Sequence, residues 1–128
     1  MLQIKKTYRK QIPKLPLLPL KNKILGKDYE LSVVFCSDYL IEKLSIKYKG
    51  SNKHKNILSF PLNKKMGEIF ININQAKKEA KYFGHDEFEH VLFLYIHGLL
   101  HLSGIKHSKK MEELEEKLTK KYKKYIRN

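Results

Sequence analysis

The longest uncharged stretch of the chain, residues 91–105, constrains the fold more than any other feature. It is shorter than the roughly 18 apolar residues that a membrane-spanning helix needs, and two histidines interrupt it. Asp86 followed by Glu89 three residues later is typical of a helix N-terminus, and Gly104 is typical of a helix end. We therefore expect a central apolar helix from residue 86 to about residue 102, in a chain that does not insert into a membrane.

Short strands and helices are expected on both sides of this central helix. Runs of β-branched and aromatic residues indicate strands, and apolar residues at helical spacing between capping residues indicate helices. Pro61 is expected to stop one strand, and Asn72 with Gln75 to form a capping box for one helix. The elements expected, in chain order, are a strand at 29–36, a helix capped by Ser37 or Asp38 and ending at Gly50, strands at 57–60 and 67–73, a helix through 83, the central helix, and a helix at about 108–125.

The N-terminal part is less regular, and its prolines limit what it can form. Residues 1–10 are expected to be an edge strand or a basic arm, and prolines at 13, 16 and 19 exclude a continuous helix before Leu20. The order of elements indicates an α+β fold, in which helices cover a small mixed β-sheet. The 128 residues suit a single domain over 1–128, with 1–27 as its basic N-terminal arm or edge segment.

Positive charge is concentrated at the two ends of the chain. The sequence has 27 Lys and Arg against 13 Asp and Glu, a formal net charge of +14. Residues 1–27 carry eight cations and no acid, residues 106–128 carry nine cations and four acids, and the middle is nearly neutral. Such ends attract polyanions and favour nucleic acid, although a solvated lysine-rich surface is the plain alternative. Tyrosines placed among the lysines are suited to stack on unpaired bases, namely Tyr8, Tyr48, Tyr122 and Tyr125.

The single cysteine and the N-terminal composition indicate a reduced, cytoplasmic protein. Cys36 has no second cysteine with which to form an internal disulfide, and prolines interrupt the only apolar stretch near the N-terminus. Nothing cationic adjoins Cys36 in sequence, so we expect an inert core thiol. Ser59 and Ser103 show no sign of nucleophile activation in the sequence.

Three histidines near the end of the central helix form the most informative pattern in the chain. His97 and His101 are four residues apart and therefore emerge from one helix face, and Gly104 turns the chain so that His107 can approach the same point. Three neutral imidazoles would leave a fourth tetrahedral position for water, as in catalytic zinc sites. The alternative is that the two helical histidines are hydrogen-bonded core residues.

The residue after the first histidine argues against peptidase chemistry. Metalloproteases with an HExxH motif have a glutamate there as general base, whereas this chain has Gly98. Two uses of that glycine remain open at this point. Gly98 either leaves room for a phosphodiester backbone beside the ion or permits a tight helix contact.

Residues 97–107, HGLLHLSGIKH, resemble the HGxLHLxGyDH signature of the YbeY family of bacterial endoribonucleases, and further elements such as Asn56-Ile57-Leu58-Ser59-Phe60-Pro61 follow in the same order. The resemblance implies an α+β fold with one Zn²⁺ per chain, bound by His97, His101 and His107. It also implies single-strand endoribonuclease activity in small-subunit rRNA 3′-end maturation and ribosome quality control. The implied partners are single-stranded RNA, rRNA and the small ribosomal subunit, and the oligomeric state is left open.

Several positions depart from the family pattern and affect the expected mechanism. Lys49 stands where members usually have arginine, and it is our candidate for stabilising charge on the phosphoryl oxygens together with the histidines. Asn56 and Lys106 each replace an aspartate, which predicts weaker zinc binding, while Lys106 favours an anionic substrate. Glu68 replaces another aspartate, and Phe93 stands where many members have a histidine.

Two other functions compete with the endoribonuclease interpretation. One is a ribosome- or RNA-binding factor with a structural zinc and weak or no catalysis, which the departures at Lys49 and Asn56 motivate. The other is a zinc peptidase, which Gly98 and the charge disfavour. His90, seven residues before His97, either extends the site toward RNA or is a partly exposed helix histidine.

Overall fold

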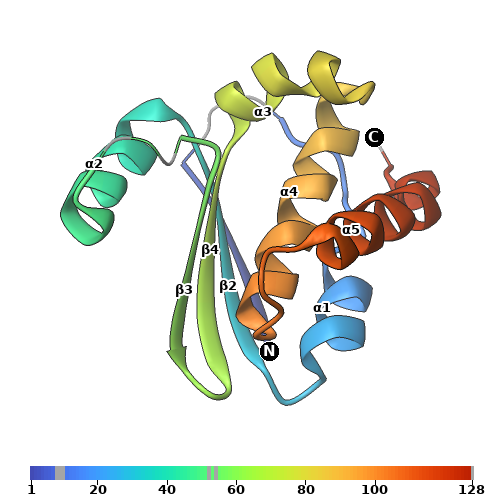
Figure 1. Ribbon diagram of the computed structural model, residues 1–128, viewed down its shortest axis with the longest axis horizontal. Coiled ribbons are helices and arrows are strands. Elements are labelled where there is room, and N and C mark those ends of the chain that lie inside the picture. Colours follow the sequence, from blue (N-terminus) through green and yellow to red (C-terminus); the bar gives the residue numbers. More distant parts are fainter. Residues whose placement is uncertain (8–10, 52, 54, 128) are drawn as a thin grey trace.

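The structure is a computed structural model, and it describes residues 1–7, 11–51, 53 and 55–127. The described residues form four strands and five α-helices, and short 3₁₀ segments follow α3 and α5 (Figure 1). Tyr8 and Lys10, which the basic arm was expected to contain, lie outside the described residues. The elements are β1 (Leu2–Lys6), α1 (Leu17–Leu25), β2 (Glu30–Cys36), α2 (Asp38–Lys49), β3 (Ile57–Asn63), β4 (Met66–Asn72), α3 (Ile73–Ala80), η1 (Lys81–Phe83), α4 (Glu87–Leu102), α5 (Lys109–Tyr122) and η2 (Lys123–Tyr125).

The four strands form one mixed sheet in the order β1-β2-β4-β3. β1 and β4 both pair in parallel with β2, and β3 returns antiparallel to β4 as a hairpin. Helices α1, α4 and α5 lie on one side of the sheet, while α2 lies on the other (Figure 1). The α+β class and the mixed sheet expected from the sequence are therefore confirmed.

Alternation along the strands creates a core on each face of the sheet. The larger core joins Val33 and Ile69 to α4, and the smaller one joins Val34 and Cys36 to α2. α4 is buried along almost its whole length, because it lies between the sheet and the helices α1 and α5. At roughly 1.5–3 kcal/mol for each fully buried large apolar side chain, this helix contributes strongly to stability.

Capping side chains set the ends of the two helices that carry and support the histidines. The Asp86 carboxylate accepts a hydrogen bond from the Glu89 backbone N–H, and the Glu89 side chain accepts one from the Asp86 N–H, as the predicted capping box requires. At α5, the Ser108 hydroxyl accepts from the Met111 backbone N–H. Within the described residues, no helix is long and apolar enough to cross a bilayer.

Both proline-based predictions of element ends were wrong. α1 begins at Leu17 and includes Pro19, because a proline in the first helical turn lacks only an N–H that would have had no partner inside the helix. β3 continues through Pro61 to Asn63, because β3 is an edge strand that pairs with β4 alone.

The capping box predicted at α3 is only half formed. The Asn72 side chain accepts a hydrogen bond from the Gln75 backbone N–H, but the Gln75 side chain donates to Glu79 instead of reaching back to Asn72.

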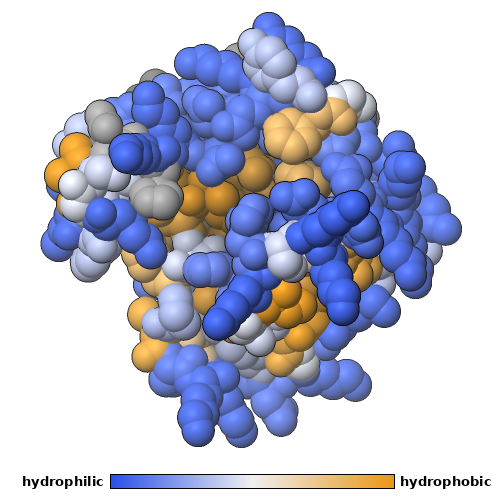
Figure 2. Space-filling view, in the orientation of Figure 1, coloured by the Kyte–Doolittle hydropathy of each residue, from blue (hydrophilic) through white to orange (hydrophobic). Residues whose placement is uncertain are grey.

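Figure 2 shows the face seen in Figure 1, where hydrophilic side chains dominate and hydrophobic ones are visible between α2 and α4. Some hydrophobic side chains are therefore exposed on this face.

Candidate functional site

The end of α4 and the loop that follows place the three predicted histidines around one cavity. His97 and His101 lie on the last turns of α4, and Gly104, at φ 93°, reverses the chain so that His107 precedes α5. All three line a cavity of about 490 Å³, together with Lys106. The His97 and His107 rings have centroids 6.3 Å apart and lie at 67° to one another.

The three imidazoles surround this cavity without converging on one point. Within the described part of the chain, no three His, Cys, Asp or Glu side chains are close enough to hold a metal ion. The His107 side chain is 73% exposed and approaches only the Glu112 carboxylate, at 3.7 Å. The structure therefore brings the predicted ligands to one cavity but leaves the loop histidine turned toward solvent.

A buried carboxylate orients the first histidine. Glu115 of α5, whose side chain is 4% exposed, accepts a hydrogen bond from Nδ1 of His97 at 2.9 Å. This bond fixes the His97 tautomer and leaves Nε2 for a ligand, which is the usual carboxylate–histidine arrangement at metal sites. The sequence interpretation missed Glu115. The signal was present, since Glu115 interrupts the apolar face of α5 between Met111 and Leu118.

His101 is set up to be neutral. Partial burial is the main cause that lowers its pKa, and the nearby His97 and Lys49 lower it further. Lys49, at the end of α2, lies with its Nζ 5.5 Å from the centre of the Phe60 ring. The predicted phosphate-binding lysine is thus close enough to His101 to act on it electrostatically.

A second histidine cluster lies at the start of α4. His90 is completely buried, so the expectation of a partly exposed histidine was wrong. Its Nε2 faces Oε1 of Glu79 at 3.4 Å, and its Nδ1 faces Nδ1 of His85 at 3.0 Å. Because a carboxylate only accepts, His90 donates to Glu79 through Nε2 and accepts from His85 through Nδ1. Both ring nitrogens of His90 therefore have protein partners, and Phe93 stacks on the ring at 17°.

Glu79 is the acceptor at the centre of this second cluster. The side-chain amides of Asn56 and Gln75 donate to its two carboxylate oxygens at 3.1 and 3.0 Å. Burial acts to raise the pKa of Glu79, but the hydrogen bonds from His90, Gln75 and Asn56 outweigh it and lower the pKa overall. A cavity of about 460 Å³ runs from this cluster to the zinc-ligand candidates, and its lining includes Asn56, Glu79, His90, His97 and His107.

Comparisons with known proteins identify the family to which the chain belongs. The family model described as Endoribonuclease YbeY matches residues 2–127. The chain belongs to the YbeY family. It is 36% identical to the Endoribonuclease YbeY of Nautilia profundicola over 107 residues, which cover 78% of this chain and 76% of that protein. It is 29% identical to the Endoribonuclease YbeY of Caldicellulosiruptor saccharolyticus, covering 97% and 87% of the two chains.

A solved structure supports the same fold. The solution structure of a Thermotoga maritima protein matches with a TM-score of 0.62 at 27% identity, over 93% of this chain and 87% of that one. The YbeY resemblance noted on the histidine signature is therefore confirmed along nearly the whole chain.

Gly98 of the YbeY signature is a packing residue in this structure. A Cβ atom there would lie 3.0 Å from side-chain atoms of Ile57 and Ile69 and 3.1 Å from the Ser59 hydroxyl. These contacts are tighter than ordinary van der Waals distances, so Gly98 permits the close approach of α4 to β3 and β4. Of the two uses left open by the sequence, the structure supports the tight helix contact.

The departures from the YbeY pattern lie at different distances from the histidines. Lys106 lines the histidine cavity, whereas Asn56 lines the adjoining cavity, where its side-chain amide donates to Glu79. Glu68 lies on β4 in a separate depression beside Glu30 and Met66, so it does not line either histidine cavity. Phe93 packs against the His90 ring, and unlike the histidine of many family members its ring has no nitrogen to offer the site.

The side chains of Cys36 and Ser103 are held in place by the fold. Cys36 is fully buried, and burial, with a smaller effect of Asp38, raises the pKa of its thiol to about 12. The Ser103 hydroxyl donates to the Leu100 carbonyl of its own helix at 2.6 Å. Histidines, lysine and carboxylates are therefore the groups with which this site can act.

Proposed function

We propose that this chain is a zinc-dependent single-strand endoribonuclease that acts in small-subunit rRNA 3′-end maturation and ribosome quality control. The observation that carries the proposal is the cavity that His97, His101 and His107 line together in a member of the YbeY family. Glu115 orients His97 at this cavity through a hydrogen bond. We place the protein in the cytoplasm, with single-stranded RNA, rRNA and the small ribosomal subunit as its partners.

By their chemistry, His97, His101 and His107 would suit one zinc ion per chain if His107 turned from solvent toward the other two. Imidazole nitrogens are preferred zinc ligands, and three of them leave an open coordination position. The Glu115–His97 hydrogen bond supplies the outer carboxylate that such ligands usually have, and the lowered pKa of His101 favours the neutral form that binds metal. When bound, zinc would polarise a water molecule or a phosphate oxygen.

The protein's own groups prepare the site for a phosphodiester. Lys49 and Lys106 place positive charge near the histidines, which attracts the RNA backbone and stabilises charge that develops on the phosphoryl oxygens. Lysine acts as a point charge, whereas an arginine at position 49 would bind two oxygens at once. Glu115 keeps His97 in a single tautomer during turnover.

Metal content and RNA cleavage test this proposal together. We expect elemental analysis to find one zinc per chain. We also expect the wild type to cleave a single-stranded RNA and His107→Ala to abolish this cleavage. The ends of the products identify the attacking group, because a 2′,3′-cyclic phosphate excludes direct attack by water as the first step. Cleavage that persists at the wild-type rate in His107→Ala would refute the proposed site.

The RNA-binding alternative makes the opposite prediction. If zinc only stabilises the fold, His97→Ala lowers the melting temperature and RNA affinity while no cleavage above background exists to lose. The peptidase alternative requires hydrolysis of a peptide that depends on His101, without RNA cleavage. Gly98 argues against it, since the position of the usual general base is occupied by a helix-packing glycine.

A further inference from the structure

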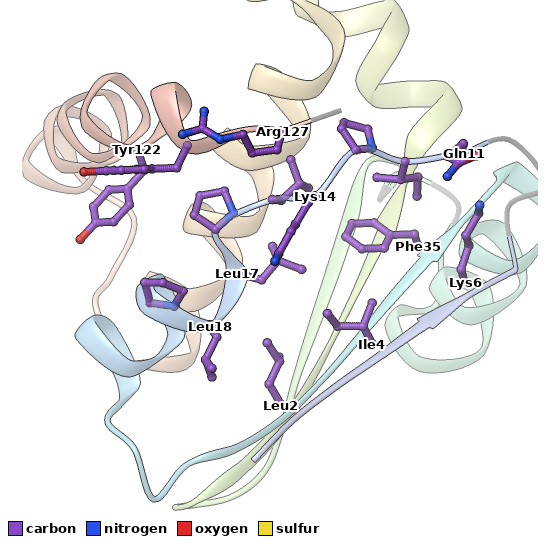
Figure 3. A pocket seen from close by; sticks show the side chains of 16 residues that line it. Leu2, Ile4, Lys6, Gln11, Lys14, Leu17, Leu18, Phe35, Tyr122 and Arg127 are labelled. Carbon is purple, nitrogen blue, oxygen red and sulfur yellow. The ribbon is translucent and has the colours of Figure 1, made fainter.

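The two basic ends of the chain meet at one place in the fold. Lys14 and Arg127 pair through their backbones, with N–H···O distances of 2.6 and 2.9 Å in the two directions. Behind this pairing lies a cavity of about 870 Å³, lined by β1, the proline-containing segment, the start of α1 and the C-terminal residues (Figure 3). The sequence showed two separate basic ends, and the fold brings Lys14 of one beside Arg127 of the other.

The lining of this cavity combines an apolar floor with a cationic and aromatic rim. Leu2 and Ile4 of β1 and Phe35 of β2 face it from the sheet, where their side chains lie together (Figure 3). Among the described residues, the lining contains no Asp or Glu. Its charged members and tyrosines are Lys6, Lys14, Arg127, Tyr122 and Tyr125.

Lys14 is positioned to meet an anion inside the cavity. Its side chain runs from the backbone pairing toward Leu17, so that the ammonium lies over the cavity (Figure 3). The described residues offer its Nζ no hydrogen-bond or ion-pair partner, although the Lys14 backbone N–H and C=O both bond to the backbone of Arg127. Arg127 uses one guanidinium nitrogen to donate to the Lys124 carbonyl at 3.0 Å, which leaves further donors for a ligand.

The size and exposed rings of the cavity fit a nucleotide. Small-molecule sites usually measure roughly 300–1,000 Å³, so the cavity is large enough for a base and its sugar. The Tyr122 and Tyr125 rings lie 6.0 Å apart, and Tyr125 is 48% exposed, with Nζ of Lys124 5.3 Å from the centre of its ring. Cations that follow the backbone, together with aromatic rings that accept bases, are the recurring design of single-strand binding sites.

We propose that this cavity binds one nucleotide of a single-stranded RNA, as an anchoring site separate from the histidine cavity. Lys14 and Arg127 contact phosphates, and the base packs on the apolar floor beside Tyr125. The two cavities share no lining residue, and the buried helix α4 lies between them. Only an RNA long enough to pass around the domain reaches both, and the role of this anchor in cleavage rests on the function proposed above.

Binding of long and short RNA separates this proposal from general electrostatic attraction. The double variant Lys14→Gln, Arg127→Gln keeps the backbone pairing, and Lys64→Gln, Lys65→Gln at the β3–β4 turn removes the same charge elsewhere. For an RNA of about 20 nucleotides, we expect the first variant to bind about tenfold more weakly and the control variant to bind within about twofold of the wild type. The slope of log affinity against log salt should fall by about 1.4, for two lost phosphate contacts.

The tyrosine provides a second, charge-independent measurement. Tyr125→Leu should weaken binding of the long RNA, whereas Tyr125→Phe, which keeps the ring, should retain it. Photocrosslinking of a 4-thiouridine RNA to the wild-type protein should label the peptide that contains Tyr122 and Tyr125. An RNA of about four nucleotides should be cleaved equally well by the wild type and the Lys14→Gln, Arg127→Gln variant, because it cannot occupy both sites.

Three outcomes would overturn the anchoring site. Equal losses of RNA affinity in the Lys14→Gln, Arg127→Gln variant and in the Lys64→Gln, Lys65→Gln control would show that the effect depends only on net charge. Absence of crosslinks at the tyrosines would exclude a base from the cavity, and binding of an acidic amphipathic peptide with unchanged RNA affinity in the variant would assign it to a protein partner. If cleavage does not depend on His107 but the long-RNA effect persists, the proposed function fails and the anchoring site stands.

Discussion

The two histidine clusters at the start and the end of α4 differ in what their ring nitrogens contact. At the start of the helix, His90 is fully buried, and both of its ring nitrogens have protein partners. At the end, His97 has one ring nitrogen on Glu115 and the other available, and His101 and His107 are exposed at a cavity. A histidine whose nitrogens are satisfied contributes to stability, whereas one with an oriented free nitrogen is able to bind a ligand.

The largest expected effect comes from the C-terminal cluster. His97→Ala should lose the stoichiometric zinc and reduce RNA cleavage by at least about 100-fold, because a zinc site with two remaining imidazoles binds metal poorly. Elemental analysis and a single-turnover cleavage assay measure the two losses. The matched variant is His90→Leu, which should retain the zinc; loss of zinc in both variants would erase the distinction between the clusters.

The next effect is expected at the residue that orients His97. Glu115→Gln keeps the shape of the side chain but weakens its hydrogen bond to the His97 ring, so it should reduce zinc affinity about 10- to 100-fold. Competition with a chromogenic chelator measures this affinity. Glu113→Gln, on the exposed face of the same helix, is the control and should match the wild type. An unchanged zinc affinity in Glu115→Gln would limit Glu115 to a packing role.

Removing His90 should affect folding more than metal binding. His90→Leu deletes two hydrogen bonds and leaves Glu79 partly buried with fewer donors, so we expect a loss of about 1–3 kcal/mol in the free energy of unfolding. Urea unfolding in the presence of excess chelator isolates this loss from any effect of zinc. A wild-type unfolding free energy would show that the cluster does not stabilise the domain.

The smallest effect concerns pH and Glu79. The folded-state pKa of Glu79 lies below its ordinary value, so its ionised form stabilises the fold above the unfolded-state pKa, and that contribution is lost as the pH falls through the folded-state pKa. Glu79→Gln should therefore be less stable than the wild type at neutral pH, and the difference should shrink in acid. Urea unfolding at a series of pH values checks this, and a difference that stays constant with pH would contradict it.

Much of the fold could be predicted because its signals are local. The Asp86–Glu89 capping box and the Gly104 turn involve residues a few positions apart, and both appear in the structure as expected. The proline-based ends failed for a different reason. The effect of Pro19 depends on its place within the helical turn, and that of Pro61 on whether its strand has one neighbour or two.

The site was only half predictable for a related reason. The spacing of His97, His101 and His107 in the sequence predicted that they lie near one another, and they line one cavity without converging on one point. Glu115 was missed because it contacts His97 across 18 positions of the chain, and His90 was misjudged because its partner Glu79 lies on a different helix. A single side chain's role in such contacts depends on how helices pack, which no short pattern encodes.

The sequence by itself determined the order of helices and strands from β2 onward, the histidine spacing and the YbeY signature, because these depend on neighbours along the chain. Only the tertiary structure decided that Gly98 is a packing residue and that His90 is buried and satisfied. It also decided that the basic ends meet at Lys14 and Arg127, which are 113 positions apart. Burial and pairing at such separations follow from the packing of whole elements, since each contact is formed only when both elements are in place.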